Sequence, residues 1–339
     1  MRAVGYQNCL PIDNPAALVD IELAEPKPTG RDLLVKVRAV SMNPVDTKVR
    51  KGVKPDAGGW KVLGWDAAGT VAAVGPDVTE FKPGDAVFYA GALDRPGTNA
   101  EYHLVDERIV GRKPASIGWS EAAALPLTAI TAWEALFDRL DIRQPVPGAA
   151  PSVLIIGGAG GVGSIAIQLV RRLTDLIVVA TASRPETQEW ARELGAHHVI
   201  DHAAPLPSQI NRLGCGPPGF VLSTTHTGAH LPAIAELIAP QGRFALIDDA
   251  PVFDINPFKR KSVSAHWEFM FTRSMFATAD IAEQGKLLDE VASLVDAGTL
   301  RTTLADTFGP INARNLRRAH ALIESGRAKG KIVLEGFGD

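Results

Sequence analysis

Val153-Leu154-Ile155-Ile156-Gly157-Gly158-Ala159-Gly160-Gly161-Val162-Gly163 is the stretch that decides the fold of this 339-residue chain. An apolar, strand-like run leads into the pattern Gly158-x-Gly160-x-x-Gly163, and apolar residues then repeat at helical spacing as far as Leu173. A strand, a glycine turn and a helix in this order form the dinucleotide-binding fingerprint of a βαβ unit. The plainer alternative is a glycine-rich turn that only packs a helix on a sheet, and the register of all three parts disfavours it.

The glycines of this loop have separate physical tasks. Gly158 allows a tight turn, Gly160 lets a pyrophosphate approach the backbone, and Gly163 permits close packing of helix on strand. The first turn of the helix presents N–H groups that have no acceptor within the helix, and these bind phosphate. We therefore predict that five residues contact the cofactor: Gly158, Gly160, Gly161, Val162 and Gly163.

The residues after the next strand decide between NAD and NADP. An NAD site places an Asp or Glu about 20 residues beyond the glycine loop, where it holds the ribose hydroxyls. Here residues 177–181 lead into Ala182-Ser183-Arg184-Pro185, which contains no acid. Ser183 and Arg184 can hold a 2′-phosphate, so the sequence favours NADPH. In a second interpretation Ser183 caps the next helix in a capping box with Glu186, and both interpretations can hold together.

Apolar runs and amphipathic helices alternate beyond the glycine loop, which is the signature of a parallel sheet with helices on both faces. The expected strands are residues 153–156, 177–181, 199–200, 220–223 and 244–247, and the expected helices are residues 162–173, 186–194 and 230–238. Helical patterns recur at residues 281–298 and 313–326, and residues 330–334 form a final strand. The fold class is therefore α/β, with a doubly wound parallel sheet.

The N-terminal third of the chain has a different pattern. Residues 32–40 alternate between apolar and charged side chains, as in a half-buried strand. Turn signals such as residues 75–77 and 82–85 recur at short intervals, which favours a barrel or sandwich of short strands. Residues 120–140 have a helical composition, and residues 145–151 form a linker.

Composition excludes several classes of protein. The formal net charge of -3 gives no nucleic-acid footprint, and the two cysteines, Cys9 and Cys215, give no disulfide framework. There is no run of about 18 apolar residues and no signal-type apolar core at the start of the sequence. We therefore expect a cytoplasmic protein without a membrane segment. With 339 residues, the chain is long enough for two domains.

Beyond these patterns, the sequence resembles the medium-chain dehydrogenase/reductase superfamily over nearly its whole length. Residues 64–75, Gly-Trp-Asp-Ala-Ala-Gly-Thr-Val-Ala-Ala-Val-Gly, are similar to the family segment Gly-His-Glu-x-x-Gly-x-Val-x-x-Val-Gly. Asn43-Pro44-Val45-Asp46 is similar to the first active-site motif of the quinone reductases. Residues 44–50 and 181–187 resemble the zinc-type alcohol dehydrogenase-like proteins within the superfamily.

The resemblance implies a GroES-like β-barrel catalytic domain joined to a Rossmann domain. We expect residues 1–125 and 270–339 to form the first and residues 126–269 to form the second. The resemblance also implies a homodimer that joins the edge strands of two nucleotide-binding sheets, near residues 262–267.

Catalytic zinc in this superfamily takes a Cys from the first motif, a His from the second, and a further Cys or His before the nicotinamide threonine. This chain has Asn43, Trp65 and Leu127 at those places. Because a catalytic zinc needs three protein ligands of suitable chemistry, we expect no metal. Two histidine pairs have a spacing that a metal could use, but no cysteine lies near them: His198 with His202, and His226 with His230.

The resemblance also places a set of residues around the nicotinamide: Asn43, Asp46, Trp65, Asp66 and Thr131. Asn43 and Thr131 are expected to donate hydrogen bonds to the cofactor or to the substrate oxygen, and Trp65 is expected to form an apolar wall. Asp66 either belongs to the reactive site or makes a structural hydrogen bond, and the sequence leaves both open.

Three further assignments complete the predicted site, and two of them carry alternatives. His202 follows the third strand, where relatives place a residue beside the adenosine phosphate, but it is equally well a surface histidine. Ile247 ends the fifth strand and completes the predicted cofactor-binding set. The aromatic run 266–271 either forms an outer wall of the substrate pocket or belongs to the core.

The missing zinc ligands decide which chemistry we expect. Zinc polarises an alcohol oxygen and lowers its pKa, so oxidation of an unactivated alcohol is difficult without it. NADPH can still pass hydride to a quinone or to the β-carbon of an α,β-unsaturated carbonyl. We expect a zinc-independent, NADPH-dependent reductase of such small molecules. The alternatives are a zinc-type alcohol dehydrogenase, and an NADPH-binding structural or regulatory protein with little turnover.

Overall fold

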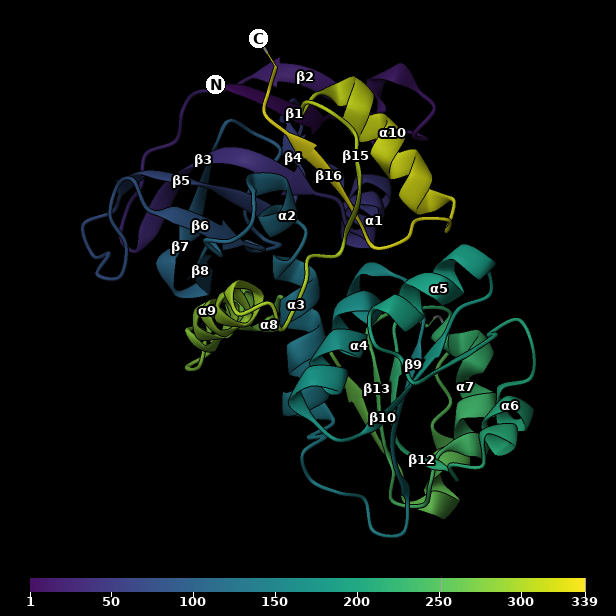
Figure 1. Cartoon of the computed structure of the whole chain (residues 1–339). Helices are drawn as coiled ribbons and strands as arrows, with labels where there is room; N and C mark the ends of the chain where they lie inside the picture. The colour runs from purple at the N-terminus through teal and green to yellow at the C-terminus, as the bar shows by residue number, and fades with distance from the viewer. Residues whose placement is uncertain (251, 339) are drawn as a thin grey trace. The chain divides into compact units, whose positions relative to one another are not determined.

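The computed structural model describes residues 1–250 and 252–338, which fold as two compact units (Figure 1). The first unit combines Met1–Ile130 with Phe271–Asp339, and the second is Thr131–Met270. The chain therefore leaves the first unit once and returns to it. The sequence analysis places its divisions at 125/126 and 269/270.

The second unit is built on one sheet of six parallel strands, in the order β11-β10-β9-β12-β13-β14. Its strands are β9 (Ala150–Ile156), β10 (Ile177–Thr181), β11 (His198–Ile200), β12 (Pro218–Ser223), β13 (Arg243–Leu246) and β14 (Ser264–Trp267). Its helices are α4 (Gly161–Leu173), α5 (Pro185–Glu193), α6 (Leu206–Leu213), α7 (Thr227–Leu237) and a 3-10 helix at Asn256–Lys261. The predicted Rossmann-type α/β fold is confirmed. The strand order reverses between β9 and β12, and ligands of such sheets bind at this switch point, beyond the carboxyl ends of the strands.

Burial of apolar side chains on both faces explains why these strands are visible in the sequence. Leu154 and Ile156 of β9 lie in one core cluster with Val221 of β12 and Phe244 of β13, and all four are fully buried. Ile234 of α7 packs into the same cluster. Strands covered on both faces carry continuous apolar runs, and such runs are what the sequence shows here.

The turn between β9 and α4 depends on glycine, but the residue that makes the tight turn is not the one that the sequence analysis predicts. The left-handed backbone occurs at Gly157, with φ of 83°, and not at Gly158. Gly158 is required for another reason, because a Cβ there would lie 2.8 Å from the Cβ of Ala180 on β10. A Cβ on Gly163 would lie 2.3 Å from the carbonyl oxygen of Gly157. The helix thus packs on the turn at a distance that only glycine allows.

The first unit contains two mainly antiparallel sheets, with strand orders β2-β1-β4 and β15-β16-β3-β5-β6-β8, and β7 also pairs with β3. The strands are β1 (Arg2–Tyr6), β2 (Val19–Glu22), β3 (Asp32–Ser41), β4 (Lys61–Val62), β5 (Ala67–Val74), β6 (Ala86–Tyr89), β7 (Tyr102–Asp106), β8 (Val110–Arg112), β15 (Leu304–Thr307) and β16 (Lys331–Glu335). These short strands form the GroES-like part of the fold.

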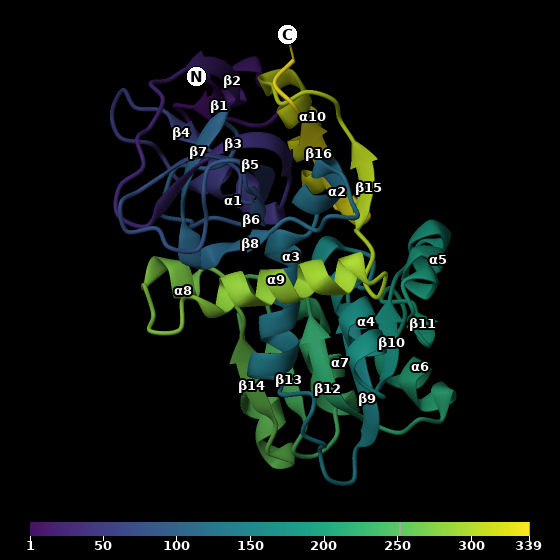
Figure 2. The same cartoon turned by 60° about the vertical axis from the view of Figure 1, so that its left-hand side comes forward.

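The C-terminal return completes this unit. Strand β16 pairs antiparallel with β3, with Val333 opposite Ser41, so the start of β16 lies beside the end of β3. The remaining helices are α1 (Pro44–Gly52), α2 (Trp119–Ala123), α8 (Thr272–Met275), α9 (Glu283–Asp296), α10 (Ala313–Glu324) and 3-10 helices at Pro15–Ala17 and Glu107–Ile109. Helix α9 lies along β8 (Figure 2). The contact is close, since a Cβ on Gly111 would lie 2.5 Å from the Cβ of Leu288.

Residues 120–140 form several pieces where the sequence predicts a continuous helical segment. Helix α2 ends at Ala123, α3 spans Pro126–Trp133, and a π-helical segment follows at Glu134–Arg139. Pro126 explains the first break, because proline has no N–H for the helical ladder and disfavours a helical residue before it. The sequence predicts neither α1 nor α6, whose residues are mostly polar or small.

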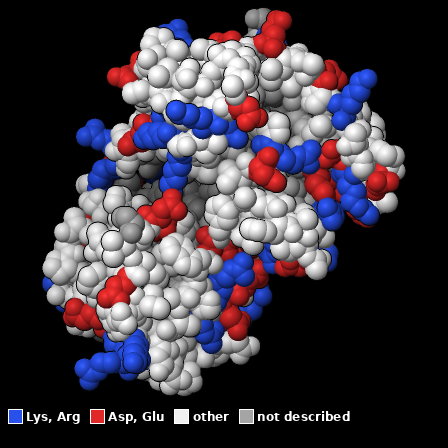
Figure 3. Space-filling model, turned by 180° about the vertical axis from the view of Figure 1, so that it is seen from behind, with Lys and Arg blue, Asp and Glu red and all other residues white. Residues whose placement is uncertain are grey.

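No helix within residues 1–250 and 252–338 is long and apolar enough to cross a membrane. Acidic and basic side chains lie interspersed over the face drawn in Figure 3. Mixed charges of this kind produce no extended field of one sign on that face.

Replacing Gly163 with alanine should destabilise the second unit by about 2–3 kcal/mol, because the added methyl group overlaps a backbone oxygen that cannot turn aside. Gly160→Ala is the matched control, since a Cβ there would have its nearest neighbour at 3.5 Å. Urea unfolding followed by circular dichroism measures both variants. Equal unfolding midpoints for the two would show that the helix packs less tightly than this geometry requires.

Candidate functional site

Polar side chains of the first unit are buried together around a lysine. Asn43 follows β3, Asp66 precedes β5 and Lys331 opens β16, and each is at most 2% exposed. Nζ of Lys331 lies 2.8 Å from Oδ2 of Asp66 and 2.9 Å from the carbonyl oxygen of Met42. The ammonium also donates to Oδ1 of Asn43. Each of its three N–H groups therefore has an acceptor.

Asp66 is held at both carboxylate oxygens. Oδ1 accepts the backbone N–H of Leu127 at 2.7 Å, and Oδ2 accepts Nδ2 of Asn43 at 2.8 Å as well as Lys331. Burial raises the pKa of Asp66, while the charge of Lys331 and these hydrogen bonds oppose the rise. Of the two interpretations open for Asp66, the contacts are those of the structural one.

Asn43 makes contacts that differ from its expected role. Its Nδ2 donates to Asp66 and, at 3.3 Å, to the carbonyl oxygen of Trp65, while its Oδ1 accepts from Lys331. The two amide hydrogens are thus engaged inside the unit, and neither is available for a cofactor or substrate oxygen. Asn43 therefore holds the backbone at Trp65, and its amide group is not placed to donate a hydrogen bond to a substrate.

Asp46, in the first turn of α1, is fully buried beside this cluster. Its Oδ2 accepts the backbone N–H of Asn43 at 2.8 Å, and its Oδ1 has no hydrogen-bond partner among the described residues. Burial is the main cause that raises the pKa of Asp46 to about 7; the Asn43 N–H and the charge of Lys331 act in the opposite direction. Asp46 therefore exchanges its proton near neutral pH.

Trp65 is buried in the apolar interior of the first unit. Its indole N–H donates to the carbonyl oxygen of Ala92 at 3.1 Å. The ring of Phe271 meets it edge-on, with ring centroids 6.3 Å apart and planes at 76°. Both side chains are buried.

The aromatic run 266–271 divides between different surroundings. Phe271 packs against Trp65, whereas Trp267 packs against Phe253 with ring centroids 5.4 Å apart and is 53% exposed. The run is therefore neither a single wall nor wholly core.

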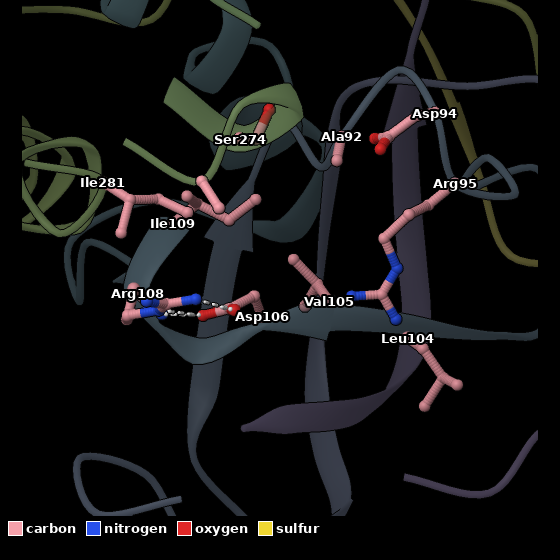
Figure 4. A pocket seen from close by; sticks show the side chains of 11 residues that line it. Ala92, Asp94, Arg95, Leu104, Val105, Asp106, Arg108, Ile109, Ser274 and Ile281 are labelled. Atoms are coloured by element: carbon pink, nitrogen blue, oxygen red, sulfur yellow. Dashed lines mark hydrogen bonds and ion pairs between the residues drawn. The ribbon is translucent and has the colours of Figure 1, made fainter. Parts of the chain in front are cut away.

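A cavity of about 120 Å³ lies in the first unit (Figure 4). It is lined by Ala92, Asp94, Arg95, Leu104, Val105, Asp106, Arg108, Ile109, Ser274, Ala277 and Ile281. Its arginines are already paired, Arg108 with Asp106 at 2.7 Å and Arg95 with Asp32 at 2.8 Å. None of the residues predicted for the active site lines this cavity, so we do not assign it to the reaction.

The predicted cofactor residues of the second unit lie at the carboxyl ends of its strands. Gly160 is the N-cap of α4, and Gly161, Val162 and Gly163 form its first turn, where N–H groups have no helical acceptor. The space above Gly160 is open, since a Cβ there would have one neighbour, at 3.5 Å. A glycine-lined helix N-terminus of this kind fits the pyrophosphate of a dinucleotide.

Ser183 and Arg184 follow β10 at the same edge. Arg184 is the N-cap of α5 and Pro185 its first residue, so the predicted capping box of Ser183 with Glu186 is wrong. Proline suits the first helical position, which moves the cap by one residue. Thr187 Oγ1 donates to the Arg184 carbonyl oxygen at 2.8 Å instead. The Arg184 guanidinium pairs with Glu186 at 2.7 Å near the surface, and because such pairs are worth at most about 1 kcal/mol, a phosphate can compete for it.

His202 is tied to the glycine loop. Its Nδ1 lies 3.2 Å from Oγ1 of Thr181, and that oxygen accepts the backbone N–H of Gly157 at 3.0 Å. Its ring also faces His230, with centroids 6.3 Å apart. These contacts distinguish His202 from an unattached surface histidine. Ile247 lies half-buried just beyond β13.

Thr131 is buried in α3 and belongs to the second unit. Three residues further, Glu134 begins the π-helical segment and its carboxyl group meets that of Glu268, which follows β14. Burial, the charge of Glu134 and its hydrogen bond raise the pKa of Glu268, and Arg139, 2.8 Å away, opposes the rise. Glu268 therefore holds its proton at neutral pH.

The residues at the expected zinc positions do not fit that metal. The side-chain oxygen of Asn43 accepts from Lys331, the indole N–H of Trp65 has no lone pair to offer, and Leu127 has no ligand atom in its side chain. Over the described part of the chain, no group of three or more His, Cys, Asp or Glu residues is arranged to hold a metal ion.

Comparison with known proteins identifies the family. Residues 29–124 match the model of the alcohol dehydrogenase GroES-like domain, and residues 194–334 match that of the zinc-binding dehydrogenases. A zinc-type alcohol dehydrogenase-like protein of Staphylococcus aureus is 40% identical over 339 residues, which cover 98% of this chain and 99% of the relative. The chain belongs to the medium-chain dehydrogenase/reductase superfamily. The resemblance seen in its motifs is thereby confirmed.

Solved structures extend the comparison. A Rhizobium etli protein that carries the provisional name of a zinc-dependent alcohol dehydrogenase is 66% identical, with a TM-score of 0.98 over 100% of this chain and 99% of that one. A quinone oxidoreductase of Coxiella burnetii is 26% identical, with a TM-score of 0.79 over 99% of each chain. This medium-chain dehydrogenase/reductase protein is thus an oxidoreductase with a nucleotide-binding fold.

Lys331 and the Glu134–Glu268 pair are among the buried groups that the sequence motifs do not indicate. In the sequence Lys331 is only one residue of a final strand. The sequence did contain a hint that Lys331 has a partner. It stands directly before the apolar run Ile332-Val333-Leu334, where a charged residue is costly to bury unless it is paired. The identity of that partner, 265 positions away, is not contained in the local pattern.

Asp46 should make the stability of the protein depend on pH. Since folding raises its pKa from 3.8 to about 7, the folded state binds the proton more strongly, and this stabilising contribution is complete below pH 3.8 and is lost as the pH rises to about 7. Asp46→Asn cannot ionise, so between pH 4.5 and 7.5 its free energy of unfolding should fall less than that of the unaltered protein, by about 3 kcal/mol.

Urea unfolding at the two pH values measures this difference. Asp77→Asn, at an exposed position, is the control and should follow the unaltered protein. If Asp46→Asn keeps the full pH dependence, the buried carboxyl group is not its source.

Proposed function

We propose that this protein is a zinc-independent, NADPH-dependent reductase of small electrophilic acceptors, either quinones or α,β-unsaturated carbonyl compounds. One observation carries the proposal: the positions for catalytic zinc hold Asn43, Trp65 and Leu127, and the polar atoms of the first two side chains are engaged within their own unit. An alcohol would therefore meet no Lewis acid to lower its pKa. Quinones and enones do not need that activation.

When bound, NADPH supplies the hydride. In this proposal the first turn of α4, from Gly161 to Gly163, takes the pyrophosphate. Ser183 and Arg184 take the 2′-phosphate, at the place where an NAD site carries an acid. Thr131 remains the proposed donor toward the cofactor or the substrate oxygen, since Asn43 has other partners.

The first unit orients the acceptor. In this proposal the buried pair of Trp65 and Phe271 backs the site that a flat acceptor enters. Asn43 holds the Trp65 carbonyl at 3.3 Å, and Lys331 and Asp66 hold Asn43 in turn. Fixed positions of this kind favour reaction because less freedom of orientation is lost on the way to the transition state.

Two other functions are possible outcomes of the test. The names of the Staphylococcus aureus and Rhizobium etli relatives favour alcohol dehydrogenase activity, and that of the Coxiella burnetii relative favours quinone reduction. An NADPH-binding protein with little turnover would keep the same glycine loop.

Assays of one protein sample in both directions should separate these functions. NADPH should be oxidised in the presence of quinones or enones, and ethanol or benzyl alcohol should not be oxidised at a useful rate with NADP⁺. Elemental analysis of the same sample should give well under one zinc per chain, and a chelator should leave the reductase activity unchanged, because Asn43, Trp65 and Leu127 cannot hold the metal.

Two results would contradict the proposal in different ways. Stoichiometric zinc that survives dialysis, together with alcohol oxidation that a chelator abolishes, would establish an alcohol dehydrogenase. NADPH binding without turnover in either direction would indicate the binding protein.

We also propose a homodimer through β14, which is an outer strand of its sheet and carries the exposed Trp267. The N–H groups of Ser264 and Glu268 donate to the carbonyl oxygens of Gly242 and Leu246, on the side of β13. Because successive residues of a strand direct their N–H groups to opposite sides, the N–H of Ala265 points away from the sheet. Light scattering should give twice the 36.0 kDa of one chain. Ala265→Pro removes an outward donor and should give a monomer, whereas Ser264→Ala should not. A monomeric unaltered protein at micromolar concentration refutes this proposal.

A further inference from the structure

Three histidines gather at the carboxyl ends of β11 and β12. His202 follows β11, His226 is the N-cap of α7, and His230 lies in its first turn. The rings of His202 and His230 face each other, with centroids 6.3 Å apart and planes at 59°. Sheets of this kind bind their ligands beyond the carboxyl ends of the strands, the edge at which these three histidines lie.

A single hydroxyl group connects His202 to the glycine loop. Oγ1 of Thr181 accepts the N–H of Gly157 at 3.0 Å and lies 3.2 Å from Nδ1 of His202. With a neutral ring the hydroxyl donates to Nδ1, and with a protonated ring Nδ1 donates to the hydroxyl oxygen. The contact thus holds in both protonation states, and Nε2 takes no part in it.

Charges of both signs face His202. The carboxylate of Asp201 favours its protonated form, and the positive groups of Arg184 and His226 oppose it. His202 is partly buried, which also disfavours the charge. Burial, the largest cause, therefore lowers the pKa of His202 below its ordinary value.

The surroundings of His230 lower its pKa as well. Burial is again the largest cause that lowers its pKa, His202 and His226 add to it, and Asp248 opposes it. The carboxylate of Asp248 is already engaged by Thr227, whose N–H donates to it at 3.0 Å. In both rings the surroundings therefore favour the neutral form.

We propose that His202 and His230 couple the binding of NADPH to the uptake of a proton. The 2′-phosphate of the cofactor binds beside the pair, and one ring takes up a proton and donates a charge-assisted hydrogen bond to it. NADH has no phosphate there and binds without the proton. This inference rests on the proposed NADPH preference and adds to it a dependence on pH.

The direction of the pH dependence follows from linkage. A bound phosphate raises the pKa of the pair, so the gain in affinity is complete below the pKa of the free pair and is lost as the pH rises through the pKa in the complex. The phosphate itself loses its second proton near pH 6, which sets the lower limit. If binding takes up one proton, the affinity for NADP⁺ should fall by up to about tenfold per pH unit between roughly pH 6.5 and 8.

Titration calorimetry with NADP⁺ and NAD⁺ tests this without any turnover. Each titration is made at pH 6.5 and 8, in two buffers of different ionisation enthalpy, so that protons taken up are counted directly. The unaltered protein should take up about one proton with NADP⁺ and none with NAD⁺. His202→Gln and His230→Gln should each reduce the uptake and flatten the pH dependence for NADP⁺, while NAD⁺ affinity stays within about twofold.

His198→Gln is the matched control, because His198 lies at the opposite end of the same strand and should leave both quantities unchanged. Equal affinity for NAD⁺ and NADP⁺ at every pH would refute the NADPH assignment, and this inference with it. A clear preference for NADP⁺ without proton uptake would refute the histidine inference alone. A loss of affinity for both nucleotides in the two variants would show that the rings contact the adenine, and would refute it as well.

Discussion

The buried pair of Lys331 and Asp66 is the contact on which the arrangement of the first unit's candidate site depends. Taking two charges out of water costs several kcal/mol for each, and their attraction repays this only where hydrogen bonds satisfy both groups. Here the ammonium has three acceptors and the carboxylate three donors. Because the groups come from β16, from the residue before β5 and from the end of β3, one set of contacts fixes three distant segments. Removing either charge would leave the other buried and unpaired.

The two units use their polar groups in opposite ways. In the first, the polar atoms of Asn43, Asp66 and Lys331 are satisfied internally. Trp65, whose carbonyl oxygen accepts from Asn43, packs edge-on against Phe271 in the apolar interior. In the second, backbone N–H groups at the start of α4 have no internal acceptor. The second unit is thus suited to hold an anionic cofactor through backbone groups.

The family name and the site chemistry point in different directions. The residues around positions 64–75 keep the glycines and small residues that the strand requires, so the fold is retained whatever the ligands are. A metal site, however, depends on three particular side chains, and those can be lost without any change in the backbone. Function therefore has to be argued from Asn43, Trp65 and Leu127 and not from the fold that carries them.

The sequence by itself determined the features that are local. It predicted β10 at residues 177–181 and the close packing at Gly163, because burial on both faces and a glycine turn leave a pattern within a few residues. Only the tertiary structure decided that Asn43 donates to Asp66, that Lys331 holds both, and that His202 faces His230. These contacts join residues up to 288 positions apart. Their energy depends on which groups the chain topology brings together, and periodicity along the chain carries no record of that.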